Sequence, residues 1–332
     1  MAHMNLLKVE NLKVHYPIRT GFINLGEKKF LKAVDGVSFE LNSGEVLGLV
    51  GESGCGKSSL GKALLRLQEP TSGSIHLSGN DFMGIKGEAL RKIRPQIQMI
   101  FQDPYASLNP RMTIEATLRE PLEAHGLCDS SEGNKLVQQV LDRVGISPKA
   151  LQKYPHEFSG GQRQRIAIAR ALVLKPKIIV ADEPVSSLDV SVQAQVLNLL
   201  KEIQREFKLS MIFISHNLSV VKYIADRIAV MYLGKIVETA DRTDIFKNPQ
   251  HPYTQALISA VPIPDPKIEK MRKRIELKGE LPSAVTPPTG CTFHTRCPIA
   301  KESCKKDSPQ LENFGTSNWQ VSCFEVKSRP SP

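Results

Sequence analysis

Hydrophobic and polar residues along this chain form short segments whose spacing predicts strands and helices in turn. Residues 5–50 look mainly β and end in the apolar run 45–50, which is typical of a strand buried on both faces. Glycines break the pattern over residues 51–59, and helical spacing begins at residues 60–67. The sequence therefore predicts a strand, a glycine-rich loop and a helix in direct succession.

The same alternation continues toward residue 250. Residues 70–102 return to β character, and residues 103 to about 154 are polar with helical spacing, as in an inserted subdomain. A helix is predicted over residues 159–174, ending before Pro176. Further predicted elements are strands at 178–181, 211–215 and 227–237 and an amphipathic helix at 192–207. Strands that alternate with helices favour a doubly wound α/β core.

The pattern changes after Pro249, where prolines become frequent and regular periodicity fades. We therefore predict two parts, as the length of 332 residues also suggests. Residues 5–250 would form a main domain with a helical insert at about 103–170. Residues 251–332 would form a C-terminal extension that holds four of the six cysteines.

Residues 51–58 read Gly-Glu-Ser-Gly-Cys-Gly-Lys-Ser and match the phosphate-binding pattern G-x-x-x-x-G-K-S/T. Glycines let backbone N–H groups turn inward around an anion, and the helix that follows directs the positive end of its dipole at the phosphates. Lys57 can reach the β- and γ-phosphates of ATP, and the Ser58 hydroxyl can bind Mg²⁺. The predicted nucleotide-binding residues of this loop are Gly51, Ser53, Gly54, Cys55, Gly56, Lys57, Ser58 and Ser59.

A second candidate site lies where the apolar strand 178–181 runs into two carboxylates, Asp182 and Glu183. Asp182 at the strand end can hold Mg²⁺ through water, and Glu183 can polarise the attacking water. Together with the phosphate loop, this pair indicates a P-loop nucleoside triphosphatase.

Residues 158–162, Phe-Ser-Gly-Gly-Gln, resemble the signature sequence of the ABC ATPase family, in which Leu usually stands where this chain has Phe. The serine is a good helix N-cap, and the two glycines leave room for a phosphate at the helix start. The signature residues predicted to contact nucleotide are Ser159, Gly160, Gly161 and Gln162.

The resemblance to ABC ATPases covers about residues 5–245 and implies further site residues. Gln102 ends a predicted strand, where the family has a glutamine that senses Mg²⁺ and the γ-phosphate. His216 follows a predicted strand as the family's switch histidine does, and Tyr16 stands where relatives stack an aromatic ring on adenine. The resemblance thus implies that Glu183, His216 and Gln102 are the catalytic residues. It also implies a P-loop core with an antiparallel β subdomain and an α-helical subdomain.

The family resemblance further implies partners for this chain. In ABC ATPases the signature of one subunit closes over ATP held by the phosphate loop of another, so two composite sites form in a dimer. Because this chain has a single cassette, it would need a second ATPase subunit, either a copy of itself or a paralogue. ATP binding would close this dimer and hydrolysis would reopen it. The resulting motion would be transmitted to two transmembrane permease subunits.

Residues near and within the C-terminal extension resemble one subfamily of ABC ATPases. Residues 248–262 resemble the segment that follows the cassette in oligopeptide and dipeptide importer ATPases, and residues 290–304 resemble their cysteine-containing C-terminal module. This resemblance implies that the chain powers the import of di- or oligopeptides with an extracytoplasmic peptide-binding protein. Alternatives are an ATPase for nickel or other solutes, a non-transport ABC ATPase acting on nucleic acid, an exporter subunit, and a chain that only binds ATP.

The formal net charge is +10, which suits nucleic acid, anionic lipid or simply a well-solvated surface. Nucleic-acid-acting relatives usually carry two cassettes or long coiled coils, which this chain lacks, so we expect no nucleic-acid partner. No apolar run of about 18 residues occurs. We therefore expect a peripheral protein on the cytoplasmic face of the cell membrane.

Four cysteines in the extension, Cys291, Cys297, Cys304 and Cys323, follow the spacing C-x₅-C-x₆-C-x₁₈-C. In a reducing cytoplasm such a cluster predicts metal binding before disulfides. Zinc sites usually have tighter pairs, so the spacing favours a 4Fe–4S cluster, as the resemblance to peptide importers also does, with Zn²⁺ or unmetallated thiols as alternatives.

Overall fold

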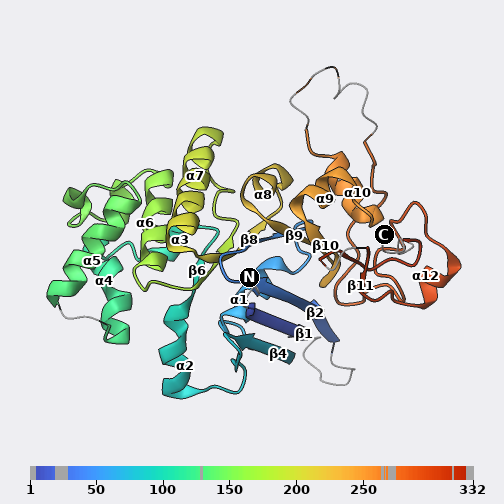
Figure 1. The fold of residues 1–332 in the computed structure, drawn as a ribbon, viewed down its shortest axis with the longest axis horizontal. Coiled ribbons are helices and arrows are strands. Elements are labelled where there is room, and N and C mark those ends of the chain that lie inside the picture. Colours follow the sequence, from blue (N-terminus) through green and yellow to red (C-terminus); the bar gives the residue numbers. More distant parts are fainter. Residues whose placement is uncertain are drawn as a thin grey trace. The chain divides into compact units, whose positions relative to one another are not determined.

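The structure is a computed structural model that describes residues 5–18, 29–127, 130–262, 265, 267, 274–315 and 318–326 (Figure 1). The chain divides into two compact units that interleave in sequence. The first unit comprises Met1–Leu6, Leu41–Val46 and Asn80–Ile214, and the second comprises Leu7–Glu40, Leu47–Gly79 and Ser215–Pro332. The predicted domain boundary at residue 250 stays a prediction.

The first unit is built on three parallel strands, β6 (Ile97–Ile100), β7 (Ile178–Asp182) and β8 (Ser210–Ser215). In their register Ile97 pairs with Ile178, and Asp182 pairs with Ile214. Every residue of β7 and β8 is buried, which explains their nearly continuous apolar sequences. The remaining elements are β5 (Asn80–Asp81), α2 (Gly87–Ile93), η1 (Arg94–Gln96), α3 (Pro104–Ser107), α4 (Ile114–His125), α5 (Ser130–Arg143), η2 (Pro148–Ala150), η3 (Pro155–Glu157), α6 (Gly160–Leu172) and α7 (Val190–Phe207).

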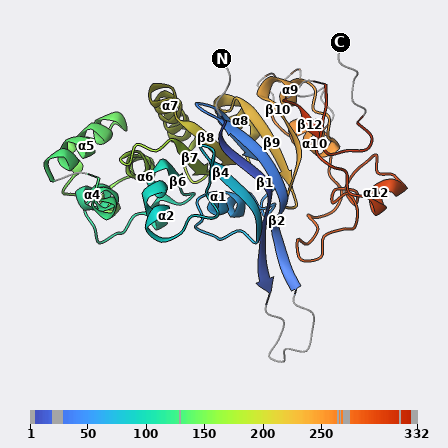
Figure 2. The same ribbon diagram turned by 60° about the horizontal axis from the view of Figure 1, so that its bottom comes forward.

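The second unit contains two groups of strands. In one, β3 (Val46–Val50) pairs in parallel with β9 (Arg227–Tyr232), which pairs antiparallel with β10 (Lys235–Asp241). In the other, β1 (Asn5–Ile18) lies between β2 (Lys29–Asn42) and β4 (Ser72–Leu77) and is antiparallel to β4, as Figure 2 shows. The other elements are α1 (Lys57–Leu64), α8 (Leu218–Ile224), α9 (Arg242–Lys247), α10 (Pro252–Ser259), α12 (Glu302–Lys306), β11 (Glu312–Asn313) and β12 (Gln320–Val321).

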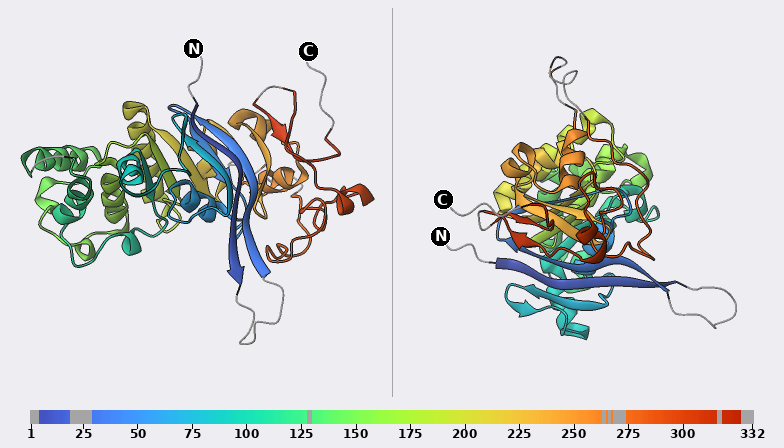
Figure 3. Two further views of the ribbon diagram at one scale, coloured as in Figure 1. Left: turned by 90° about the horizontal axis from the view of Figure 1, so that it is seen from below. Right: turned by 90° about the vertical axis from the view of Figure 1, so that its right-hand side faces the viewer.

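Within the second unit, the C-terminal extension pairs with strand β10. There β12 pairs antiparallel with β10, and the two segments run side by side in the ribbon views (Figure 3). The Ser322 N–H donates to the Val237 carbonyl at 2.9 Å. The carboxylate of Glu238, fully buried on β10, accepts hydrogen bonds from the N–H groups of Gln250 and His251 and from Trp319 Nε1. Glu238 therefore fixes two segments that follow β10 in sequence, one at residues 250–251 and the other at residue 319.

The predicted α/β fold is confirmed, with parallel strands and covering helices. A separate cysteine-rich module is not confirmed, because the C-terminal segments cluster within the second unit. Within the described part of the chain, no helix has the length and apolar character needed to span a bilayer.

Candidate functional site

The phosphate loop runs from the end of β3 to the start of α1, in the context that the sequence predicted. Two of its glycines are dictated by close packing. A Cβ atom on Gly51 would lie 2.2 Å from the Met231 carbonyl oxygen, and one on Gly56 would lie 1.9 Å from that of Ala33. Both residues also have positive φ angles, 156° and 105° respectively. Only glycine fits the loop at these points.

Lys57 is the first residue of α1 and is 5% exposed. Its Nζ donates to the carbonyl oxygens of Gly51 at 2.8 Å and Glu52 at 2.9 Å, and it lies 3.6 Å from Cys55 Sγ. The ammonium group is therefore folded back into the loop, where phosphate oxygens could replace the carbonyls. Burial raises the pKa of the Cys55 thiol, so this side chain is a neutral part of the loop wall.

The other predicted nucleotide residues of the second unit differ in exposure. Ser53 and Gly54 are exposed at the loop tip, whereas Ser58 and Ser59 on α1 are half-buried. Tyr16 on β1 is half-buried, and His216 is exposed just after β8. All of them belong to the same unit as the phosphate loop.

The predicted site residues Asp182, Glu183 and Gln102 belong to the first unit. Asp182 is buried at the carboxyl end of β7, with 4% of its surface exposed. Glu183 follows it with φ of 46°, a left-handed conformation that is uncommon for a residue with a side chain. The Glu183 N–H donates to the Ile214 carbonyl at 3.0 Å, and its Oε2 accepts from Gln102 Nε2 at 3.3 Å. The structure thus brings together two residues that lie 81 positions apart in sequence.

The signature residues begin helix α6 in the same unit. Ser159 caps the helix: its Oγ accepts from the Gln162 N–H at 3.4 Å, and Gln162 Oε1 accepts from the Ser159 N–H at 3.0 Å. A Cβ on Gly161 would lie 2.4 Å from Val192 Cγ1 of α7, so this glycine allows the two helices to pack closely. Ser159, Gly160 and Gln162 remain exposed, as their predicted contact with nucleotide held by another chain requires.

Three residues in or next to the phosphate loop were not identified from the sequence as parts of the site. Glu52 occupies a variable position of the motif, and Tyr253 and Arg296 come from the C-terminal extension. Arg296 forms two hydrogen bonds with the Glu52 carboxylate, and Tyr253 Oη accepts from the Glu52 N–H. In the sequence, Glu52 stands out only as the single acidic residue of the motif.

The prediction of an iron–sulfur cluster is wrong. The four cysteines of the extension, Cys291, Cys297, Cys304 and Cys323, line one hollow, but its volume is about 10 Å³, which is room for about one water molecule. Burial raises the pKa of Cys291 and Cys323 and raises that of Cys297 to about 11, which favours neutral thiols over the thiolates that metals require. Across the described ranges, no group of three or more His, Cys, Asp or Glu residues could hold a metal ion. The predicted zinc alternative therefore has no support either.

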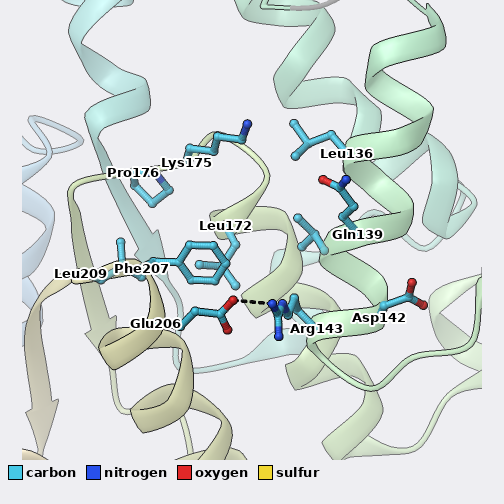
Figure 4. A pocket seen from close by; sticks show the side chains of 11 residues that line it. Leu136, Gln139, Asp142, Arg143, Leu172, Lys175, Pro176, Glu206, Phe207 and Leu209 are labelled. Carbon is cyan, nitrogen blue, oxygen red and sulfur yellow. Dashed lines mark ion pairs between the residues drawn. The ribbon is translucent and has the colours of Figure 1, made fainter.

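A larger cavity of about 550 Å³ lies in the first unit, and none of the predicted site residues lines it (Figure 4). Its walls are largely apolar and include Leu136, Leu172 and Phe207. Arg143 at its edge is paired with Glu206. A largely apolar wall in which Arg143 is paired with Glu206 does not favour a triphosphate, so the phosphate loop stays the candidate nucleotide site.

Two protein families match the sequence. Residues 34–186 match "ABC transporter", and residues 237–304 match "Oligopeptide/dipeptide transporter, C-terminal region". The first range includes the phosphate loop, the signature and both strand-end carboxylates. The second includes Tyr253 and Arg296, which contact that loop.

Curated relatives match almost the full chain. The oligopeptide transport ATP-binding protein AppF of Bacillus subtilis is 52% identical over 96% of both chains. OppF of Escherichia coli, also an oligopeptide transport ATP-binding protein, is 53% identical over 97% of this chain and 96% of its own. The dipeptide transport ATP-binding protein DppF of Haemophilus influenzae is 49% identical over 97% of each.

A solved structure shares the fold. The ATP-binding cassette MJ0796, captured as a dimer in a post-hydrolysis state bound to ADP and Pi, superposes with a TM-score of 0.62 at 27% identity. The superposition covers 71% of this chain and 99% of the cassette.

Proposed function

This chain belongs to the ATP-binding proteins of oligopeptide and dipeptide ABC transporters, and from that premise we propose that it hydrolyses ATP to power the import of short peptides. The observation that carries the proposal is identity of about half the residues over nearly the full length of proteins named for peptide transport. The match includes the C-terminal region, so the peptide specificity rests on more than the common cassette.

The phosphate loop would bind MgATP through its backbone N–H groups and Lys57. Because the Lys57 ammonium lies within the loop and donates to two of its carbonyl groups, it would exchange those two partners for phosphate oxygens. We predict that the Ser58 hydroxyl, the Gln102 amide and the Asp182 carboxylate would hold Mg²⁺, because oxygen atoms are the donors that this ion prefers. When bound, the ion would supply positive charge to the phosphates. Tyr16 would stack on the adenine ring.

Glu183 would act as general base. Its carboxylate accepts a hydrogen bond from Gln102 and can take a proton from the attacking water. The water oxygen then bonds to the γ-phosphorus, the bond from the γ-phosphorus to the bridging oxygen breaks, and ADP leaves with that electron pair. His216 would orient the γ-phosphate. The strained backbone at Glu183 is held by its N–H bond to Ile214, which fixes the carboxylate at the strand end.

The exposed signature of a second ATPase subunit, a paralogue or another copy, would close the nucleotide site. Ser159, Gly160, Gly161 and Gln162 present the N-terminus of α6, which favours a phosphate. We place the dimer on the cytoplasmic face of the cell membrane, bound to two permease subunits that receive peptide from an extracytoplasmic binding protein. The helical insert at about 103–170 would contact the permeases. Nucleic acid has no part in this proposal.

Peptide uptake by cells tests the proposal. A strain that lacks this chain, complemented with wild type, should accumulate labelled di- or oligopeptide, and the Lys57→Ala variant should reduce uptake to the level of the empty strain. Nickel uptake by the same strains should be unchanged. Peptide uptake that does not depend on the chain, together with nickel uptake that does, would reassign the substrate and leave the ATPase intact.

A further inference from the structure

Glu52 in the phosphate loop is held at three points, two of them by the C-terminal extension. Arg296 donates from Nη1 to Glu52 Oε2 at 2.7 Å and from Nη2 to Oε1 at 3.1 Å. The Glu52 N–H donates to Tyr253 Oη at 2.9 Å. The third point is the Glu52 carbonyl, which accepts from Lys57 Nζ. The extension therefore contacts both the backbone and the side chain of a residue inside the nucleotide motif.

The ion pair between Arg296 and Glu52 is partly shielded from water, mainly on the side of Arg296. The Arg296 side chain is 8% exposed and that of Glu52 is 28% exposed. A bidentate guanidinium–carboxylate pair fixes geometry as well as charge. When one member of such a pair is removed, the other is left as an uncompensated charge with little solvation. Here the remaining charge would be a carboxylate inside a loop that must accept a triphosphate.

Arg296 and Tyr253 are themselves fixed by a compact aromatic cluster. Tyr232 of β9, Tyr253 of α10 and Phe293 are each at most 1% exposed. Their ring centroids lie 4.8 to 5.4 Å apart, in edge-to-face and tilted arrangements that favour aromatic pairs. The Arg296 guanidinium lies 6.0 Å from the Tyr232 ring centroid. The packed rings therefore restrain the Arg296 guanidinium and the Tyr253 hydroxyl, the two groups that contact Glu52.

The extension also lies along the loop at a second place. A Cβ on Gly54 would be 4.0 Å from Leu281 Cδ2, and the Lys32 N–H donates to the Ala284 carbonyl at 3.0 Å. The extension thus approaches the loop at Gly54 and is also hydrogen-bonded to β2 at Lys32. The contact with Glu52 is therefore one of several that the extension makes in this part of the second unit.

We propose that Arg296 and Tyr253 are positioning residues of the nucleotide site, which hold and neutralise Glu52 so that the loop N–H groups face the phosphates. The integrity of the C-terminal extension then sets the affinity of the loop for MgATP. In this role both residues act through Glu52, and neither is a catalytic residue. The inference rests on the proposed assignment of residues 51–58 as the ATP-binding loop.

Equilibrium dissociation constants for MgATP test this inference. All variants are made in the full chain carrying Glu183→Gln, which prevents turnover. Arg296→Ala should raise the Kd about tenfold, because the freed carboxylate repels the triphosphate. Adding Glu52→Gln should return the Kd to within about threefold of Glu52→Gln alone. Tyr253→Phe should raise the Kd by a smaller factor, since it removes only the acceptor for the Glu52 N–H.

Two controls separate the possible failures. Lys301→Ala breaks the ion pair between Lys301 and Glu325, which lies in the same extension away from the loop, and it should leave the Kd within about twofold of the parent. Lys57→Ala should abolish binding, and retained binding there would mean that the loop assignment itself is wrong. If Arg296→Ala does not fold, Arg296→Gln, which keeps a long polar side chain but removes the charge, carries the same comparison with and without Glu52→Gln.

Steady-state kinetics distinguish positioning from a general loss of structure. In the chain with Glu183 intact, Arg296→Ala should raise KM for ATP while kcat stays within about twofold, because the groups that perform the chemistry remain in place. Folded Arg296→Ala protein with an unchanged Kd would overturn the inference. A raised Kd that Glu52→Gln does not restore would overturn it as well.

Discussion

At the scale of single residues, the spacing of the phosphate loop was sufficient to predict a glycine-dependent turn between a strand and a helix. The pattern requires glycine at its first and sixth positions, and the structure gives the reason at Gly51 and Gly56, where neighbouring carbonyl oxygens leave no room for a Cβ. The pairing of Gln102 with Glu183 also agrees with their predicted shared role. The sequence did not indicate the partners of Glu52, because Arg296 lies 244 positions away and no periodic pattern links the two.

Gly56→Ala tests the packing of the loop. The added methyl group would collide with the Ala33 carbonyl oxygen, so the free energy of unfolding should fall by about 3 kcal/mol or more and ATP binding should be lost. Gly79→Ala is the matched control, since Gly79 also has a positive φ, 81°, but nothing lies within 4 Å of its Cβ position. That variant should lose about 1 to 2 kcal/mol. Equal losses in urea titrations of the two variants would argue against close packing at Gly56.

At the scale of elements, the apolar periodicity located the main strands and helices. The predicted helix at 192–207 corresponds to α7, Val190–Phe207, and the predicted strand at 178–181 corresponds to β7. The elements of the C-terminal extension were not predicted, since they are short and depend on contacts distant in sequence. Helix α10, for example, begins at a proline and is capped by His251.

His251 gives the extension a pH-dependent stability. Burial lowers the pKa of His251 to about 3, and its Nδ1 accepts from the Tyr253 N–H at 3.1 Å. Below about pH 6.5 the unfolded chain binds a proton that the folded chain excludes, so stability falls with acidity. Between pH 7 and 5 this group should cost about 2 kcal/mol.

Comparison with His251→Asn isolates that contribution. Asparagine keeps a capping acceptor but does not titrate. The free energy of unfolding of wild type, from urea titrations at pH 7 and 5, should decline by about 2 kcal/mol more than that of the variant. Parallel declines would show that His251 can be protonated in the folded protein.

At the scale of the whole molecule, family membership could be inferred from ordered motifs, whereas the metal content could not be inferred from cysteine spacing. Spacing predicted that Cys291, Cys297, Cys304 and Cys323 converge, and they do line one hollow. It could not reveal how much room they enclose, or that burial raises the pKa of Cys291, Cys297 and Cys323 and so favours their neutral form. The same region instead contributes Arg296 and Tyr253 to the nucleotide loop.

Phosphate release by the assembled transporter, in proteoliposomes with its permeases and peptide-binding protein, tests the central claim most directly. Peptide should stimulate hydrolysis of MgATP by wild type, and Glu183→Gln should reduce the rate by about 10² to 10⁴-fold while MgATP still binds. That result would identify this chain as the ATPase that drives peptide import. Peptide-stimulated hydrolysis that persists undiminished in Glu183→Gln would contradict the account.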